Sequence, residues 1–133
     1  MERSVIAHFF IILFLILTSG CSNAQTEKTG IKVINAQEFK EKLDATEEGY
    51  LIDVRTPNEF KSGAIKGSIN YNILDGTFSS KIKGLDKTKA IFVYCAKGGR
   101  SNNAAKMLLK EGFSEIYDLK GGYGDWPFKV NTD

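Results

Sequence analysis

The most constraining feature of this 133-residue chain is an apolar run that ends abruptly at a cysteine. Residues 90–94 (Ala-Ile-Phe-Val-Tyr) have the composition of a buried β-strand, and Cys95 follows them directly. The segment from Ala96 to Arg100 contains two glycines and two cations, and residues 101–110 have the pattern of a helix. We therefore expect the cysteine at the carboxyl end of a strand, in a short loop that opens a helix.

This predicted loop has the properties of an anion-binding site. Backbone N–H groups at the start of a helix point into such a loop, and the helix dipole favours negative charge there. A nest of successive N–H groups has the same effect, and Lys97 and Arg100 add full positive charges. All of these lower the pKa of a thiol, whose thiolate is the nucleophilic form. We therefore expect Cys95 to be reactive; the alternatives are an inert buried thiol and a disulfide with Cys21.

The N-terminal residues differ in composition from the rest of the chain. Residues 5–17 are mostly apolar, but this run of 13 residues is shorter than the roughly 20 that a membrane-spanning helix needs. Its length fits the apolar core of a signal peptide. The run ends in Leu-Thr-Ser-Gly-Cys, which resembles the lipobox of bacterial lipoproteins, although Thr18 replaces the usual branched aliphatic residue. By that resemblance, residues 1–20 are a cleaved signal peptide; the alternatives are an uncleaved helix and a signal cut elsewhere.

The lipobox resemblance also implies a membrane partner and a location. Cys21 would carry more than one acyl chain, which is enough for stable anchoring. The protein would then be lipid-anchored in the bacterial cell envelope, with its folded part in the periplasm. Residues 21–30 would comprise the lipidated cysteine and a flexible polar tether. Residues 31–130 are long enough for one domain with one core.

Charge and histidine content exclude several classes of function. The formal net charge is +2, and so small an excess of positive charge does not indicate a nucleic-acid partner. The one histidine, His8, lies in the predicted signal peptide, so the folded domain has no histidine that could activate Cys95. A single free cysteine cannot supply ligands at metal-binding spacing. We therefore expect neither a metal site nor a cofactor.

Strand-like and helical segments alternate through the rest of the chain. We expect strands at residues 31–34, 50–53, 69–71, 90–94 and 115–119, helices at 36–43, from 57 onward, at 77–83 and at 101–110, and a final turn or helix before Pro127. This alternation predicts an α/β fold with a mainly parallel central sheet flanked by helices. Ligands of such sheets bind at the carboxyl ends of the strands, where Asp53, Cys95 and the loop after Leu119 are all expected.

Three charged residues stand close together where the second predicted strand ends, namely Asp53, Arg55 and Glu59. Between them, Thr56 is a good N-cap and Pro57 suits the first position of a helix, with Glu59 at the third. The charged side chains either take part in the site or form a buried ion network that fixes the turn. We prefer the network, because carboxylate–arginine pairs are strong geometric clamps.

Four segments, in this order, resemble the conserved blocks of the rhodanese domain. They are Asp53-Val54-Arg55 with Glu59-Phe60, the run Gly63-Ala64-Ile65-Lys66-Gly67-Ser68-Ile69-Asn70, the loop from Cys95 to Ser101, and Leu119-Lys120-Gly121-Gly122 with Trp126. Ala64 stands where the family commonly has histidine, a residue that is usually structural. From Ile31 to Phe128 the chain is similar to a single rhodanese domain, which implies a three-layer α/β fold.

The resemblance implies transfer of sulfane sulfur. Cys95 would attack the outer sulfur of a small anionic donor such as thiosulfate and become a persulfide, and a thiol or cyanide would then take that sulfur. A protein could also be the sulfur acceptor. The residues expected to bind donor and persulfide, through loop N–H groups and two cations, are Ala96, Lys97, Gly98, Gly99 and Arg100. Those expected to support the site are Asp53, Arg55, Glu59 and Ser101.

Two other functions stay open at this point. Phosphatases and arsenate reductases of the same fold have five residues between the cysteine and the arginine, whereas this chain has four. The shorter loop suits one sulfur atom better than a tetrahedral oxyanion. A persulfide carrier that does not turn over, or a partner-binding module, would have a similar loop, although an inert scaffold would be expected to lack Cys95.

Overall fold

The computed structural model describes residues 30–129 as one α/β domain. The predicted signal peptide, the predicted lipidation site Cys21 and most of the predicted tether lie outside the described residues. The strands are β1 (Gly30–Ile34), β2 (Gly49–Asp53), β3 (Ile69–Asn70), β4 (Ala90–Tyr94) and β5 (Glu115–Leu119). The helices are α2 (Ala36–Ala45), α3 (Pro57–Lys61), α4 (Phe78–Lys83), α5 (Gly99–Glu111) and the short 3-10 helix η1 (Tyr123–Asp125). Within residues 30–129, no helix is long and apolar enough to cross a membrane.

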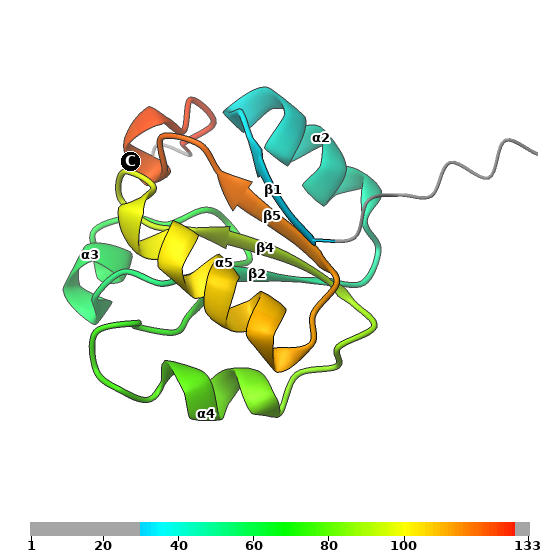
Figure 1. The fold of residues 1–133 in the computed structure, drawn as a ribbon. Helices are drawn as coiled ribbons and strands as arrows, with labels where there is room; N and C mark the ends of the chain where they lie inside the picture. Colours follow the sequence, from blue (N-terminus) through cyan, green and yellow to red (C-terminus); the bar gives the residue numbers. More distant parts are fainter. Residues whose placement is uncertain (1–29, 130–133) are drawn as a thin grey trace, which may run out of the picture.

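The five strands form one sheet in the order β1-β5-β4-β2-β3, and every neighbouring pair is parallel. This confirms the predicted parallel α/β fold. Strand β4 is central, and all of its residues are buried, because helices cover both faces of the sheet at this point. Parallel strands deliver their carboxyl ends to one edge, so the residues that follow β2, β4 and β5 meet there (Figure 1).

Two apolar clusters hold the layers together, one on each face of the sheet. On one face α4 and α5 pack against alternate strand residues, including Ile91 and Val93 of β4. On the other face α2 and the segment after β5 pack around Phe39 and Phe92, whose rings meet edge to face at 5.4 Å. Both phenylalanine side chains are fully buried, which is worth about 2 kcal/mol each. Cys95 belongs to the cluster on the α5 face.

Local sequence signals set several helix ends. Asn35 accepts a hydrogen bond from the N–H group of Glu38 and caps α2. Thr56 and Glu59 form a complete capping box at the start of α3. At the C-terminal end of α5, Gly112 adopts φ +107° and the N–H group of Phe113 donates to the carbonyl of Leu108, which is the geometry of a glycine C-cap.

One predicted boundary was wrong in a way that matters for the site. Helix α5 begins at Gly99, two residues before the predicted start at Ser101. Gly98 is the N-cap residue, and its φ of +107° is a conformation that a glycine adopts without strain. Gly99 and Arg100 therefore lie in the first helical turn, and the loop after Cys95 is shorter than the sequence indicated.

Candidate active site around Cys95

The Cys95 thiol lies at the carboxyl end of β4, enclosed by the loop that leads into α5. The residue is only 1% exposed, and the N–H group of Gly98 donates to its sulfur at 3.0 Å. Burial raises the pKa of Cys95, whereas a hydrogen bond from the Ser101 hydroxyl group lowers it. The N–H groups of Lys97, Gly98 and Ser101 lower it as well, and the net pKa lies below the usual value for a thiol. The loop therefore stabilises negative charge on sulfur.

Helix α5 supplies part of this stabilisation through its orientation. Its first turn begins beside Cys95, so its unpaired N–H groups and the positive end of its dipole face the sulfur. The helix runs for 13 residues and is anchored by Ala104, Ala105 and Leu108, which are buried against the sheet. A long, well-packed helix keeps these donors in place without a rearrangement when the sulfur becomes charged.

The loop after β5 forms the second wall of the site. The N–H group of Tyr123 donates to the carbonyl of Cys95 at 2.7 Å, and that of Gly124 donates to the carbonyl of Ala96 at 2.9 Å. Gly122 makes this contact possible, because a Cβ atom at its position would lie 2.5 Å from the carbonyl oxygen of Cys95. The glycine-rich terminal segment is therefore bonded directly to the backbone of the cysteine loop.

Arg100 and Glu59 form a two-pronged ion pair that joins the first turn of α5 to α3. The guanidinium Nη1 and Nη2 atoms of Arg100 each lie 2.8 Å from a carboxylate oxygen of Glu59. Glu59 also accepts hydrogen bonds from the N–H and hydroxyl groups of Thr56. The hydrogen bond from Arg100, with help from Thr56, lowers the pKa of Glu59 to about 2. Because its two terminal nitrogens are paired, Arg100 is a clamp on the loop more than a free donor-binding group.

Asp53 and Arg55 form a separate, buried ion pair. Arg55 Nη2 lies 2.7 Å from Asp53 Oδ2 and also donates to the carbonyl of Gly63 at 2.6 Å. The guanidinium group lies over the ring of Tyr123, 4.4 Å from its centroid. The predicted network of three residues is thus divided: Asp53 and Arg55 fix the turn after β2, while Glu59 reaches the α5 side.

The remaining predicted loop residues differ in exposure. Lys97 and Gly99 are exposed, whereas Ala96 and Gly98 are partly buried. Ser101 is fully buried in the first turn of α5, where its hydroxyl oxygen also lies 3.1 Å from the carbonyl oxygen of Gly98. Lys97 is therefore the exposed cation that lies nearest to Cys95 along the sequence. Within residues 30–129 no group of three or more His, Cys, Asp or Glu side chains could hold a metal ion.

One buried polar residue of this region, Asp118, is absent from the residues that the sequence pattern predicted for the site. It lies in β5, is 2% exposed and is close to the side chains of Ser101 and Asn102. The signal that could have revealed it is an acidic residue within the otherwise apolar run Ile116 to Leu119. A carboxyl group in a strand covered on both faces requires a polar partner or a proton.

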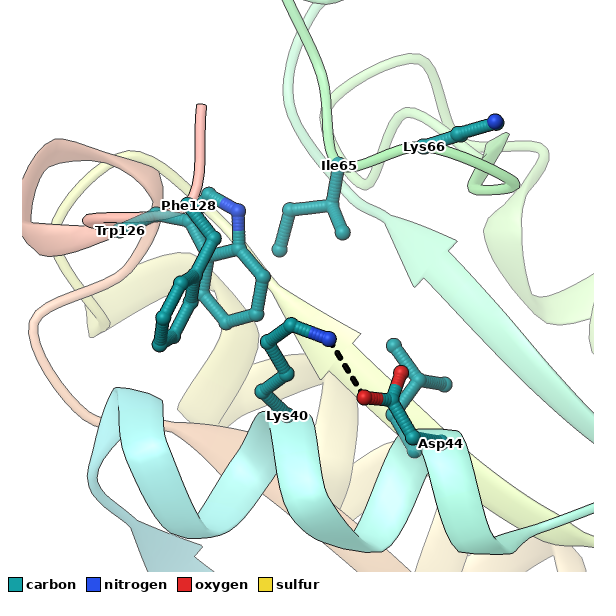
Figure 2. Close-up of a pocket in the computed structure, with 7 residues that line it drawn as sticks. Lys40, Asp44, Ile65, Lys66, Trp126 and Phe128 are labelled. Atoms are coloured by element: carbon teal, nitrogen blue, oxygen red, sulfur yellow. Dashed lines mark hydrogen bonds and ion pairs between the residues drawn. The ribbon is translucent and has the colours of Figure 1, made fainter. Parts of the chain in front are cut away.

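A separate cavity of about 270 Å³ lies on the α2 side of the sheet (Figure 2). Its lining includes Ile65, Trp126 and Phe128, with Lys40 and Asp44 forming an ion pair at the α2 wall. None of the predicted site residues lines it. The side chain of Trp126 packs in the apolar cluster on the α2 face, whereas Cys95 belongs to the cluster on the α5 face.

The family assignment follows from this fold and site. The family described as Rhodanese-like domain matches residues 35–128, and the chain belongs to it. YtwF of Bacillus subtilis (strain 168), provisionally named a sulfurtransferase, is 38% identical over 72% of this chain and 90% of its own length. The thiosulfate sulfurtransferase GlpE of Shewanella oneidensis is 34% identical over 57% of this chain and 73% of its own.

Two further matches agree with the assignment. YrkF of Bacillus subtilis (strain 168), provisionally named a sulfur carrier protein, is 27% identical over 97% of this chain and 65% of its own length. Among solved structures, a rhodanese-related protein of Thermoplasma volcanium is 36% identical, with a TM-score of 0.63 over 71% of this chain and 89% of that one. The chain is thus a rhodanese-like domain with sulfurtransferase and sulfur-carrier relatives.

Proposed function

We propose that the protein is a sulfurtransferase that carries sulfane sulfur on Cys95 as a persulfide. The observation that supports this most directly is the Cys95 sulfur itself, which receives the Gly98 N–H group at 3.0 Å at the start of α5. With its pKa held below the usual value, Cys95 provides a thiolate without a neighbouring base, and the domain contains no histidine to act as one. The same N–H groups would stabilise a persulfide anion.

The reaction consists of two displacements at sulfur. The Cys95 thiolate attacks the outer sulfur of thiosulfate, a new S–S bond forms, and sulfite leaves with the electron pair of the broken S–S bond. A thiolate or cyanide then attacks the outer sulfur of the persulfide, and Cys95 leaves as the thiolate. No net oxidation of the protein occurs, and each step needs the anionic form that the loop stabilises.

Several features of the site favour a small anionic donor. Cys95 is almost inaccessible, so a thin molecule is a better fit than a bulky one. Four residues separate Cys95 from Arg100, a spacing that suits one sulfur atom, and Lys97 offers an exposed positive charge for the approach. The resemblance to GlpE, a protein named for its thiosulfate activity, is consistent with thiosulfate as the assay donor.

A persulfide carrier is the second candidate, favoured by the likeness to YrkF. The two functions differ in turnover, which an assay with excess thiosulfate and cyanide measures as thiocyanate formed per protein. A sulfurtransferase gives many equivalents, whereas a carrier gives about one, and Cys95→Ser gives none in either case. Equal thiocyanate formation by the native protein and Cys95→Ser would contradict both.

We also propose that Cys21 is lipidated after removal of residues 1–20 and anchors the protein in the bacterial cell envelope, with the domain in the periplasm. The proposal rests on the short apolar run and the Leu-Thr-Ser-Gly-Cys ending. Expression of the full chain in a bacterium, followed by membrane fractionation and mass analysis of the N-terminal peptide, tests it. An acylated peptide in the membrane fraction is expected, and Cys21→Ser should abolish acylation. An unmodified Cys21 in the native chain would contradict it.

A further inference from the structure

Tyr123 lies where the four segments that the sequence singles out come together. It belongs to the last of them, and its ring centroid lies 4.4 Å from the guanidinium carbon of Arg55 in the first. A Cβ atom added at Gly63, in the second segment, would lie 2.8 Å from the Tyr123 hydroxyl oxygen, so the ring runs close to that backbone. The N–H group of Tyr123 bonds to the third segment, at Cys95. One residue therefore contacts each of the other three segments.

The backbone of η1 holds two successive peptide groups of the cysteine loop, beside which it lies (Figure 1). The N–H group of Tyr123 donates to the carbonyl of Cys95 at 2.7 Å, and that of Gly124 donates to the carbonyl of Ala96 at 2.9 Å. Each of these carbonyls shares a planar peptide group with the N–H group of the next residue, Ala96 or Lys97. Holding the two carbonyls therefore fixes the direction in which the first N–H groups of the loop point.

The ring of Tyr123 ties this backbone to a buried ion pair. Arg55 is 5% exposed and paired with Asp53, and its guanidinium group lies over the ring. A second cation, the Lys129 ammonium group, lies 4.9 Å from the ring centroid and donates to the carbonyl of Gly124 at 3.3 Å. The face of an aromatic ring attracts cations, most strongly where water is excluded. The ring is thus held by charged groups, one of which is anchored in the core.

The effect of Tyr123 on the Cys95 sulfur is indirect. Tyr123 packs against the apolar cluster on the α2 face, whereas Cys95 belongs to the cluster on the α5 face. The ring therefore acts through the backbone that it holds, and the loop carries the effect to the N–H group of Gly98, which donates to the sulfur at 3.0 Å. A loop held at its first two carbonyls keeps this donor in place.

We propose that Tyr123 is a positioning residue for Cys95: its ring, held against Arg55, fixes the backbone bond to the Cys95 carbonyl and so keeps the loop N–H groups directed at the sulfur. The proposal rests on the Cys95 thiolate of the proposed function. It extends the role of the Asp53–Arg55 ion pair from the turn after β2 to the nucleophile. The ring and not the hydroxyl group carries this role, because the cations lie over the ring.

The test follows the rate of Cys95 alkylation by iodoacetamide against pH, on the reduced full-length protein in detergent micelles, with the Cys95 peptide resolved from Cys21 by mass. Tyr123→Leu removes the ring but keeps an apolar side chain. It should raise the Cys95 ionisation midpoint by about one pH unit, because loosened N–H groups stabilise the thiolate less. Below the midpoint, alkylation and sulfur loading should both slow about tenfold, and alkylation should recover at high pH. Tyr123→Phe keeps the ring and should behave like the native protein.

Tyr50→Leu is the matched control. The ring of Tyr50 also has a lysine over it, Lys89 at 5.9 Å, but Tyr50 lies near the amino end of β2, away from the site. This variant should leave the Cys95 midpoint within a few tenths of a pH unit. Tyr123→Met replaces Tyr123→Leu if the latter does not fold.

A folded Tyr123→Leu variant with the native Cys95 midpoint would overturn the proposal, as would a Tyr123→Phe or Tyr50→Leu variant that shifts the midpoint equally. Alkylation involves no sulfur transfer, so its pH profile tests the positioning role by itself. Native protein that shows the expected alkylation profile but gains no sulfur from thiosulfate would contradict the proposed function and leave the role of Tyr123 supported.

Discussion

At the scale of single residues, the Glu59–Arg100 ion pair predicts how the stability of the protein depends on pH. The pKa of Glu59 is lowered from 4.5 to about 2, chiefly by the hydrogen bond from Arg100. A lowered folded-state pKa adds stability that is present above pH 4.5 and is lost as pH falls toward 2. Because the Glu59 side chain is 35% exposed, solvent screening keeps this contribution near 1 kcal/mol.

We therefore expect Glu59→Gln to lower the free energy of unfolding by about 1 kcal/mol at neutral pH. The difference from the native protein should shrink between pH 4.5 and pH 2, measured by urea unfolding at several pH values. Glu47→Gln, on the exposed turn before β2, is the matched control and should change little. A Glu59→Gln difference that is constant down to pH 2 would show that the ion pair is not its cause.

The buried Asp53–Arg55 ion pair behaves differently, because water cannot solvate either side chain when its partner is removed. Arg55→Met removes the guanidinium group that donates to both carboxylate oxygens of Asp53, while the buried Asp53 keeps the hydrogen bond from the N–H group of residue 55. We expect the free energy of unfolding to fall by about 3–5 kcal/mol, the usual cost of breaking a buried ion pair on one side. Lys61→Met, which changes an exposed cation nearby on α3, should cost less than about 0.5 kcal/mol. Equal losses for the two variants in urea unfolding would contradict the structural role of the pair.

The reactive cysteine could be predicted from the sequence, but its partners could not. Cys95 stands out because an apolar strand, glycines and cations surround it within a few residues. The partner of Arg100, by contrast, is 41 residues away, and local patterns do not show which carboxylate reaches it. Asp118 was missed for the same reason, since it comes close to Ser101 only once β5 lies beneath α5.

At the scale of elements, the site depends on the contact between the terminal loop and the cysteine loop. Gly122 adopts φ +64° and ψ −162°, a conformation that is essentially restricted to glycine. Gly122→Ala would also place a Cβ atom 2.6 Å from the carbonyl carbon of Ala96. The two loops must then separate, which would disrupt the bond from Tyr123 to the Cys95 carbonyl.

We expect Gly122→Ala to slow sulfur loading of Cys95 by about 100-fold, the order of loss that a 1 Å misplacement can cause. Gly67→Ala is the control, because Gly67 also has a positive φ, of +84°, but no atom lies within 4 Å of the added Cβ. It should cost about 1 kcal/mol in stability and leave loading unchanged. Normal loading by a folded Gly122→Ala variant would show that the terminal loop does not position the site.

Element order was well predicted, because apolar patterns and caps such as Thr56 and Gly112 are local signals. The start of α5 was predicted wrongly, because two flexible glycines stand side by side in the sequence there. Only the structure shows that Gly98 takes the left-handed conformation and that Gly99 is helical. This difference brings the N-terminus of α5 close enough for the Gly98 N–H group to reach sulfur.

At the scale of the whole molecule, the parallel topology explains why the residues of the candidate site lie at one edge of the sheet. Strands β2, β4 and β5 end together, so Asp53, Cys95 and the loop after Leu119 meet without being close in sequence. This gathering could be predicted from the alternation of strands and helices. The strand order and the placement of α2 on one face and α5 on the other needed the structure.

The central claim is that Cys95 accepts a sulfur atom, and intact-mass measurement after thiosulfate treatment tests it most directly. The reduced, folded protein should gain the mass of one sulfur, and a thiol should remove it. Cys95→Ser should gain nothing, while Lys61→Met should load like the native protein. A native protein that is reduced and folded but gains no sulfur from thiosulfate would contradict the account.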